Sequence, residues 1–111
     1  MNYYQTAQQT INICGYTFEG PYTNTNYLRD ASGIYVILDK RGDGKWYVLD
    51  VGESGQIKTR IDNHDRKNDW TRSSSGTLGA AILYTSGWSD QQRRNLESEI
   101  RDAYNPPCGE R

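Results

Sequence analysis

Two strand-like runs separated by a short glycine-rich segment constrain the fold of this chain most. Residues 33–39 are rich in β-branched and aromatic side chains, and so are residues 46–51. Between them, residues 41–45 read Arg-Gly-Asp-Gly-Lys, which is the composition of a turn. The spacing therefore predicts an antiparallel β-hairpin with a connection of moderate length.

Further strands are expected on either side of this hairpin. Residues 10–14 have the composition of a first strand. Residues 78–85 carry few polar side chains, which is typical of a central strand covered on both faces. The segment 19–26 contains Gly20-Pro21 and several Asn and Thr residues, and it is predicted to be turn and loop.

Two helices are expected. Residues 55–67 have apolar side chains at helical spacing, with Ile57 and Ile61 on one side. A second helix begins after Ser89, because Ser89 and Gln92 have the spacing of a capping box. It must end before the two prolines at 106 and 107. Its predicted inner stripe is Leu96, Ile100 and Ala103.

Length and charge bound the class of protein. A chain of 111 residues fits one domain, with a core at about residues 31–107 and an N-terminal extension at 1–30. Nine tyrosines and three tryptophans can fill a core that has few aliphatic side chains. The net charge is −1, so attraction to a polyanion must come from a local cluster of cations.

The compartment is inferred from what the sequence lacks. No apolar run approaches the roughly 20 residues that a membrane span needs, and the first residues do not resemble a signal peptide. Cys14 and Cys108 form no disulfide framework, although a single bridge between them stays open. Two cysteines and one histidine are too few for a zinc site. We expect a cytoplasmic protein that does not enter membranes.

Four side chains have the chemistry that hydrolysis of a phosphodiester requires. Tyr35 can take part in proton transfer, Arg60 can grip a phosphate, and His64 lies four residues on along the same helical face. Glu97 can hold one hard divalent ion. Each also has a plainer interpretation: a packed aromatic ring, a solvated charge, a satisfied histidine, and a surface ion pair with Arg93 or Arg101.

At these residues the chain resembles the GIY-YIG nuclease family. Gly33-Ile34-Tyr35 matches the first motif literally, and Asp50-Val51-Gly52 stands at the second. Arg60 and His64 fall where the family has its helix arginine and, in some members, a histidine. Glu97 precedes Pro106 as the family's metal-binding glutamate precedes a proline. The resemblance covers residues 33–107.

The resemblance implies an α+β fold, with a small three-stranded antiparallel sheet flanked by helices. It implies cleavage of DNA that depends on Mg²⁺ or Mn²⁺. In this interpretation Tyr35 helps to deprotonate water and Arg60 steadies the phosphate. Glu97 ligates the metal, and His64 assists.

The chain departs from the family pattern at two positions. Asp50 replaces the tyrosine of the second motif, and Gly109 stands where an asparagine is common. Asp50 could accept a proton from water, add a metal ligand, leave the site impaired, or be only a polar residue at a strand end. Strict alternation places Asp50 on the face of Trp46 and Val48, and Tyr47 on the opposite face.

Cations near the Arg60 helix predict contacts to a nucleic-acid backbone, and one tryptophan there could stack on a base. The set is Lys58, Arg66, Lys67, Trp70 and Arg72. A solvated helix face, diluted by neighbouring aspartates, is the alternative. We expect a metal-dependent endonuclease acting on DNA, whose specificity is either weak or supplied by a partner protein or a homo-oligomer. The alternatives are a catalytically impaired module that binds nucleic acid and a protein-interaction domain.

Overall fold

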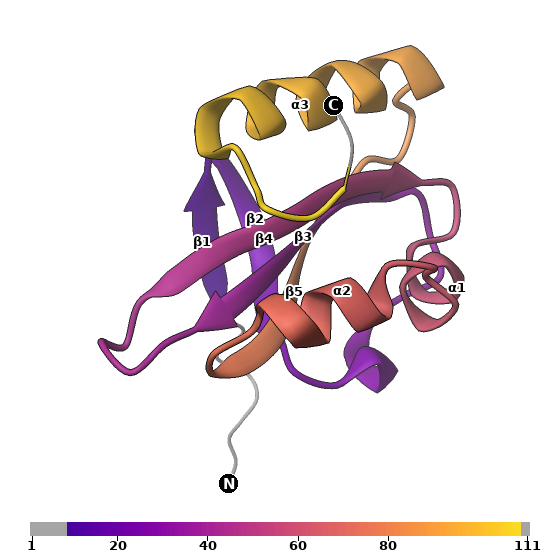
Figure 1. Cartoon of the computed structure of the whole chain (residues 1–111). Coiled ribbons are helices and arrows are strands. Elements are labelled where there is room, and N and C mark those ends of the chain that lie inside the picture. The colour runs from indigo at the N-terminus through magenta and orange to yellow at the C-terminus, as the bar shows by residue number, and fades with distance from the viewer. Residues whose placement is uncertain (1–8, 110–111) are drawn as a thin grey trace, which may run out of the picture.

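The computed structural model describes residues 9–109, in which a five-stranded antiparallel sheet carries helices on both faces (Figure 1). The strands are β1 (Thr10–Ile13), β2 (Tyr16–Tyr22), β3 (Gly33–Lys40), β4 (Trp46–Ser54) and β5 (Thr77–Tyr84). The helices are the 3₁₀ turn η1 (Thr25–Tyr27), α1 (Ile57–Asp62), α2 (Lys67–Ser73) and α3 (Asp90–Tyr104). The strand order is β1-β2-β5-β3-β4.

The α+β class and the central hairpin are confirmed, but the sheet has five strands where three were expected. β5, β3 and β4 make the expected three, and the β1–β2 hairpin extends the sheet beyond β5. The prediction of a loop from residue 19 was wrong, because β2 continues to Tyr22. Its pairing with β5 is irregular between Glu19 and Tyr22, which is where a strand tolerates Pro21.

Side chains of β3 alternate between two hydrophobic layers, so this strand is buried on both faces. One layer lies under α3 and contains Ile34, Val36, Leu38, Val51, Leu96 and Ile100. The other lies under α1 and α2 and contains Tyr35, Ile37, Ile57, Ile61 and Trp70. The predicted stripe of α3 is confirmed at Leu96 and Ile100 but not at Ala103, which is exposed in the last turn.

The single helix expected at residues 55–67 is two helices, and the break between them contains His64. The start of α3 is confirmed: Ser89 Oγ accepts from the Gln92 backbone N–H at 3.1 Å, and Gln92 Oε1 accepts from the Ser89 N–H at 2.8 Å. Every helix within residues 9–109 is too short or too polar to cross a membrane.

The chain after α3 turns back across the edge strand β4 (Figure 1). The Cys108 backbone N–H donates to the Leu49 carbonyl at 2.9 Å, so this C-terminal segment satisfies part of the open edge. Cys14 and Cys108 are both free thiols. This C-terminal segment lies where the end of helix α3 meets strand β4 and helix α2, around one group of polar side chains.

Candidate active site

The centre of the site is a contact between Tyr35 on β3 and His64 in the break between α1 and α2. His64 Nε2 lies 2.7 Å from Tyr35 Oη. The Arg66 backbone N–H donates to His64 Nδ1 at 3.0 Å, so the neutral ring carries its proton on Nε2. His64 therefore donates to the phenol oxygen.

Gly52 makes room for the Tyr35 ring. The two residues are partners across the β3–β4 ladder. A Cβ atom at position 52 would lie 2.1 Å from Tyr35 Oη and 2.2 Å from Cζ, so any larger residue would displace the ring. The glycines of the two sequence motifs therefore have different uses, because only the second one seats the tyrosine of the first.

Burial sets the protonation states of the pair. Tyr35 is 1% exposed, and desolvation raises its pKa to about 12, although the charge of the nearby Arg60 guanidinium opposes this shift. Desolvation, together with the charges of Arg60 and Arg66, lowers the pKa of His64 to about 4. At neutral pH the phenol is protonated and the imidazole is neutral.

The depressed pKa of His64 predicts a specific loss of stability in acid. The unfolded chain protonates this ring near pH 6.5 and the native state only near pH 4, so unfolding takes up a proton between these values. The free energy of unfolding should fall by up to about 1.4 kcal/mol for each pH unit between about 6.5 and 4. Urea denaturation at pH 7, 6, 5 and 4.5 measures this slope.

The H64Q variant is the control for this slope, because it keeps a polar group at the position but does not titrate. Its pH dependence should be flatter than that of the wild type over the same interval. Equal slopes in the two proteins would show that the acid sensitivity comes from carboxylates and not from His64.

The strand register places Asp50 on the face opposite to the predicted one. Alternation predicted that Asp50 shares a face with Trp46 and Val48. The β3–β4 register shifts between Ile37 and Leu38, which inserts one extra residue into β4 and reverses the alternation. Trp46 and Val48 consequently pack on the α3 side, whereas Asp50 faces α2.

Asp50 is fully buried, and its carboxylate is surrounded by hydrogen-bond donors. The donors, each at 2.8 Å, are the Val51 backbone N–H, Arg66 Nε, Trp70 Nε1 and Arg101 Nη2. A carboxylate with this many partners has no oxygen lone pair directed toward solvent. Among the alternatives left open by the sequence, this geometry favours a structural role for Asp50 over a role as proton acceptor or metal ligand.

Steric constraints explain why a glycine stands at position 109, the second departure from the family pattern. Its φ is +89°, which is favourable for glycine alone. A Cβ atom there would lie 2.6 Å from Asp50 Oδ1 and 2.5 Å from Arg101 Nη2. Arg101 also donates to the Cys108 carbonyl at 3.1 Å. The C-terminal segment thus closes directly over the Asp50–Arg101 ion pair.

Tyr47 does not replace the missing tyrosine of the second motif. It is paired with Asp39, four residues along β3 from Tyr35, and its hydroxyl donates to Asp43 in the hairpin turn. Because of the register shift it lies on the same face as Tyr35, contrary to the alternation argument. Its position near the far end of the hairpin keeps it out of the site.

Arg60 and Glu97 approach the site from opposite sides of β4. Arg60, on α1, has a side chain that is 41% exposed, and its Nη2 lies 3.7 Å from Asp65 Oδ1. Glu97, on α3, is 26% exposed, and its Oε2 lies 3.7 Å from Arg101 Nε. Burial raises the pKa of Glu97, and the carboxylates of Glu53 and Asp50 raise it further, whereas Arg101 and Arg66 lower it. Glu97 thus belongs to the same charge network as Asp50.

The residues present fit a divalent ion only as a single protein ligand. No group of three or more His, Cys, Asp or Glu side chains within residues 9–109 could hold a metal. Glu53 is engaged by Arg93, whose Nε donates to Oε1 at 2.8 Å. Glu97 is a hard, half-buried oxygen donor, and Mg²⁺ commonly binds one carboxylate together with waters and substrate phosphates.

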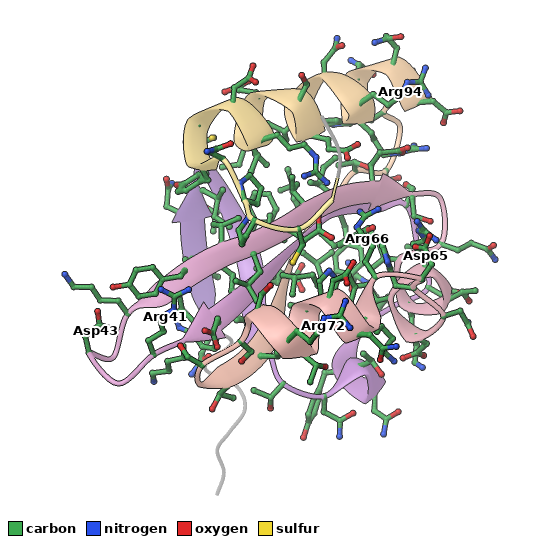
Figure 2. The ribbon with its side chains drawn as sticks, viewed as in Figure 1. Arg41, Asp43, Asp65, Arg66, Arg72 and Arg94 are labelled. Atoms are coloured by element: carbon green, nitrogen blue, oxygen red, sulfur yellow. The ribbon has the colours of Figure 1, made fainter. Side chains whose placement is uncertain are left out.

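The predicted nucleic-acid contacts divide into buried, paired and half-exposed side chains. Trp70 is only 4% exposed and donates to Asp50, so the prediction that it stacks on a base was wrong. Lys58 pairs with Asp62, Lys67 donates to the Asp62 carbonyl, and Arg72 pairs with Asp69. Arg66 is 25% exposed. Figure 2 shows it with Asp65 where α1 gives way to α2, beside β4.

Sequence reasoning missed two buried arginines. Arg93 and Arg101 were interpreted as surface partners of Glu97, yet both are buried and hold Glu53 and Asp50. The available signal was their spacing, because positions 93, 97 and 101 recur every four residues beside the apolar stripe of α3.

The site therefore unites the motif tyrosine, the helix histidine and the helix arginine on one face of the sheet. Glu97 joins it through Arg101 and Arg66 at the edge of β4. No protein-family model, no curated protein and no solved structure matches this chain.

Proposed function

We propose that this protein is a divalent-metal-dependent endonuclease that hydrolyses phosphodiester bonds of DNA. The observation that carries the proposal is the 2.7 Å contact from His64 Nε2 to Tyr35 Oη, packed over Gly52 with Arg60 beside it. The sequence grouped Tyr35, Arg60 and His64 into one site through their phosphodiester chemistry and the resemblance to the family, not through spacing alone. Their contact in three dimensions is the supporting argument, together with the resemblance to GIY-YIG nucleases.

Tyr35 is the proposed proton carrier. Because its pKa is about 12, the phenol acts in its protonated form. One oxygen lone pair accepts from His64, and the Arg60 guanidinium hydrogen-bonds the same oxygen in the free protein. When Arg60 turns onto a phosphate, the second lone pair and the phenolic hydrogen become available to substrate. In the proposed step Tyr35 accepts a proton from the attacking water and passes its own hydrogen to a phosphate oxygen. His64 holds the phenol in this orientation.

Arg60 binds the phosphate and controls access to Tyr35. Since the phenol is 1% exposed in the free protein, substrate must displace something that covers it. The half-exposed Arg60 guanidinium hydrogen-bonds the phenol, and its planar fork suits a phosphate. When Arg60 turns onto a phosphate, the Tyr35 hydroxyl becomes reachable, and the arginine offsets charge in the transition state.

Glu97 would hold the divalent ion at the edge of β4. A bound Mg²⁺ or Mn²⁺ supplies charge stabilisation for the phosphate and the leaving oxygen. Burial is the main reason that the pKa of Glu97 is raised, and a divalent ion bound to this carboxylate would offset that cost of desolvation.

Nicking of supercoiled plasmid tests the function. The wild type should convert it to open-circular and linear forms in Mg²⁺ or Mn²⁺, and EDTA should abolish this. E97A should lose about 100-fold in rate, because it lacks the proposed metal ligand. E99A is the matched control on an exposed position of α3 and should nick at the wild-type rate.

The outcomes of this assay distinguish the nuclease from an impaired binding module and from a protein-interaction domain. Metal-dependent nicking that survives unchanged in E97A would contradict the role of Glu97. DNA binding without products in any metal would contradict the nuclease proposal and support an impaired binding module. A folded protein that neither binds nor cuts DNA would leave the protein-interaction reading.

A further inference from the structure

Asp50 and Arg66 form an ion pair whose role does not follow from the resemblance to the family motifs. Asp50 stands where the family has a tyrosine, yet it is buried and saturated. Two of its four close partners, Val51 and Trp70, belong to the local scaffold. The other two, Arg66 and Arg101, are cations that arrive from α2 and α3. One buried carboxylate therefore fixes two guanidinium groups.

The two arginines differ in what they can reach. Arg101 is buried, and it also donates to the Val51 and Cys108 carbonyls, so it joins α3 to β4 and the C-terminal segment. Arg66 is 25% exposed and directs Nε at Asp50 Oδ2, with a weaker 3.5 Å contact from Nη2. The Nε–Nη2 edge of the guanidinium is therefore turned toward Asp50, and Nη1 is the nitrogen that does not contact this carboxylate.

Arg66 lines an open hollow of about 480 Å³ together with Asp65, Asp69 and Gly109. The hollow adjoins the catalytic pair, because the Arg66 backbone N–H bonds His64 and the Arg66 charge acts on both His64 and Tyr35. Burial raises the pKa of Glu97, and the Arg66 charge acts against this shift. The charge of Arg66 thus acts on both Tyr35 and the proposed metal ligand Glu97.

We propose that Arg66 binds a phosphate oxygen of the DNA beside Tyr35, and that Asp50 is the positioning residue that holds its guanidinium there. This inference rests on the proposed nuclease function. A guanidinium anchored through Nε presents a rigid fork to an anion, and little conformational freedom is lost when the phosphate arrives. The substitution of the second-motif tyrosine by aspartate then supplies a second phosphate-binding cation next to Arg60.

The salt dependence of DNA binding measures a phosphate contact directly. Fluorescence anisotropy of a labelled duplex, in EDTA to prevent cleavage, gives the slope of log K against log salt concentration. R66Q should reduce the magnitude of this slope by about 1, as expected for one lost phosphate contact. It should also lower kcat/KM for nicking by about 10- to 100-fold. A purely structural arginine would leave the slope unchanged.

Two further variants complete the test. R94Q removes an exposed arginine of α3 that lies away from Arg66 in Figure 2, and it should keep the wild-type slope and rate. R66K keeps the charge but lacks the Nε–H that Asp50 accepts. It should retain the slope and still lose about 10-fold in kcat, because the cation is no longer anchored.

The outcomes test the phosphate contact of Arg66, the positioning role of Asp50 and the nuclease function separately. A wild-type slope in folded R66Q overturns the phosphate contact while the nuclease proposal stands. A wild-type rate in R66K overturns the positioning role of Asp50. A wild type that neither binds nor nicks DNA overturns both the function and this inference. D50N, if it folds by circular dichroism, should behave as R66K does, and wild-type activity in it also overturns the positioning role.

Discussion

Replacing Tyr35 by phenylalanine should lower the rate of metal-dependent nicking by about 10²- to 10⁴-fold while the protein stays folded. The range is that of a lost group in proton transfer. The ring still packs against Gly52, so the layer under α1 and α2 is kept. The His64 Nε2–H loses its acceptor, which costs about 1–3 kcal/mol of the free energy of unfolding. Single-turnover nicking rates, with circular dichroism as the folding check, measure both effects.

Y47F is the matched control, because it makes the same chemical change at the other end of the hairpin. The Tyr47 hydroxyl donates to Asp43 and contacts nothing in the site. Its loss should leave the nicking rate unchanged. If folded Y35F nicks within about threefold of the wild type, the Tyr35 hydroxyl has no part in proton transfer, and the Tyr35–His64 contact serves packing alone.

Local patterns were enough to predict the central hairpin, and the motif residues Tyr35 and His64 are in contact in the structure. Alternating apolar runs and turn composition are short-range signals, and the β3–β4 pairing follows from them. Likewise, spacing along the chain placed Arg60 and His64 near one another. The extra hairpin of β1 and β2 was harder, because Gly20-Pro21 is a turn signal that an irregular strand pairing overrides.

The features that could not be predicted from the sequence depend on tertiary contacts. The register shift beside Asp50 depends on the partner strand and leaves no mark in the composition of β4, yet it decides which face Asp50 occupies. The break between α1 and α2, which brings His64 against Tyr35, interrupts a continuous helical pattern. Arg101 looked like a surface charge because its partner Asp50 is 51 residues away.

The buried ion-pair network should dominate stability, and D50A should lower the free energy of unfolding by about 3–5 kcal/mol. The substitution leaves Arg101 buried without its carboxylate and removes the acceptor of the Trp70 indole N–H. Guanidinium denaturation followed by fluorescence and circular dichroism measures the change. D69A, which removes an exposed partner of Arg72, is the control and should shift the same quantity by less than about 1 kcal/mol.

A double-mutant cycle shows whether the loss comes from the stranded charge. If D50A is costly because buried Arg101 loses its closest carboxylate, then adding R101M should recover part of the loss. The double variant should be more stable than the sum of the single changes predicts by about 0.5–3 kcal/mol. Strict additivity would mean that Asp50 stabilises the fold through Val51 and Trp70 instead. Because Arg101 also holds the C-terminal segment at Cys108, the recovery should be incomplete even when the charges are coupled.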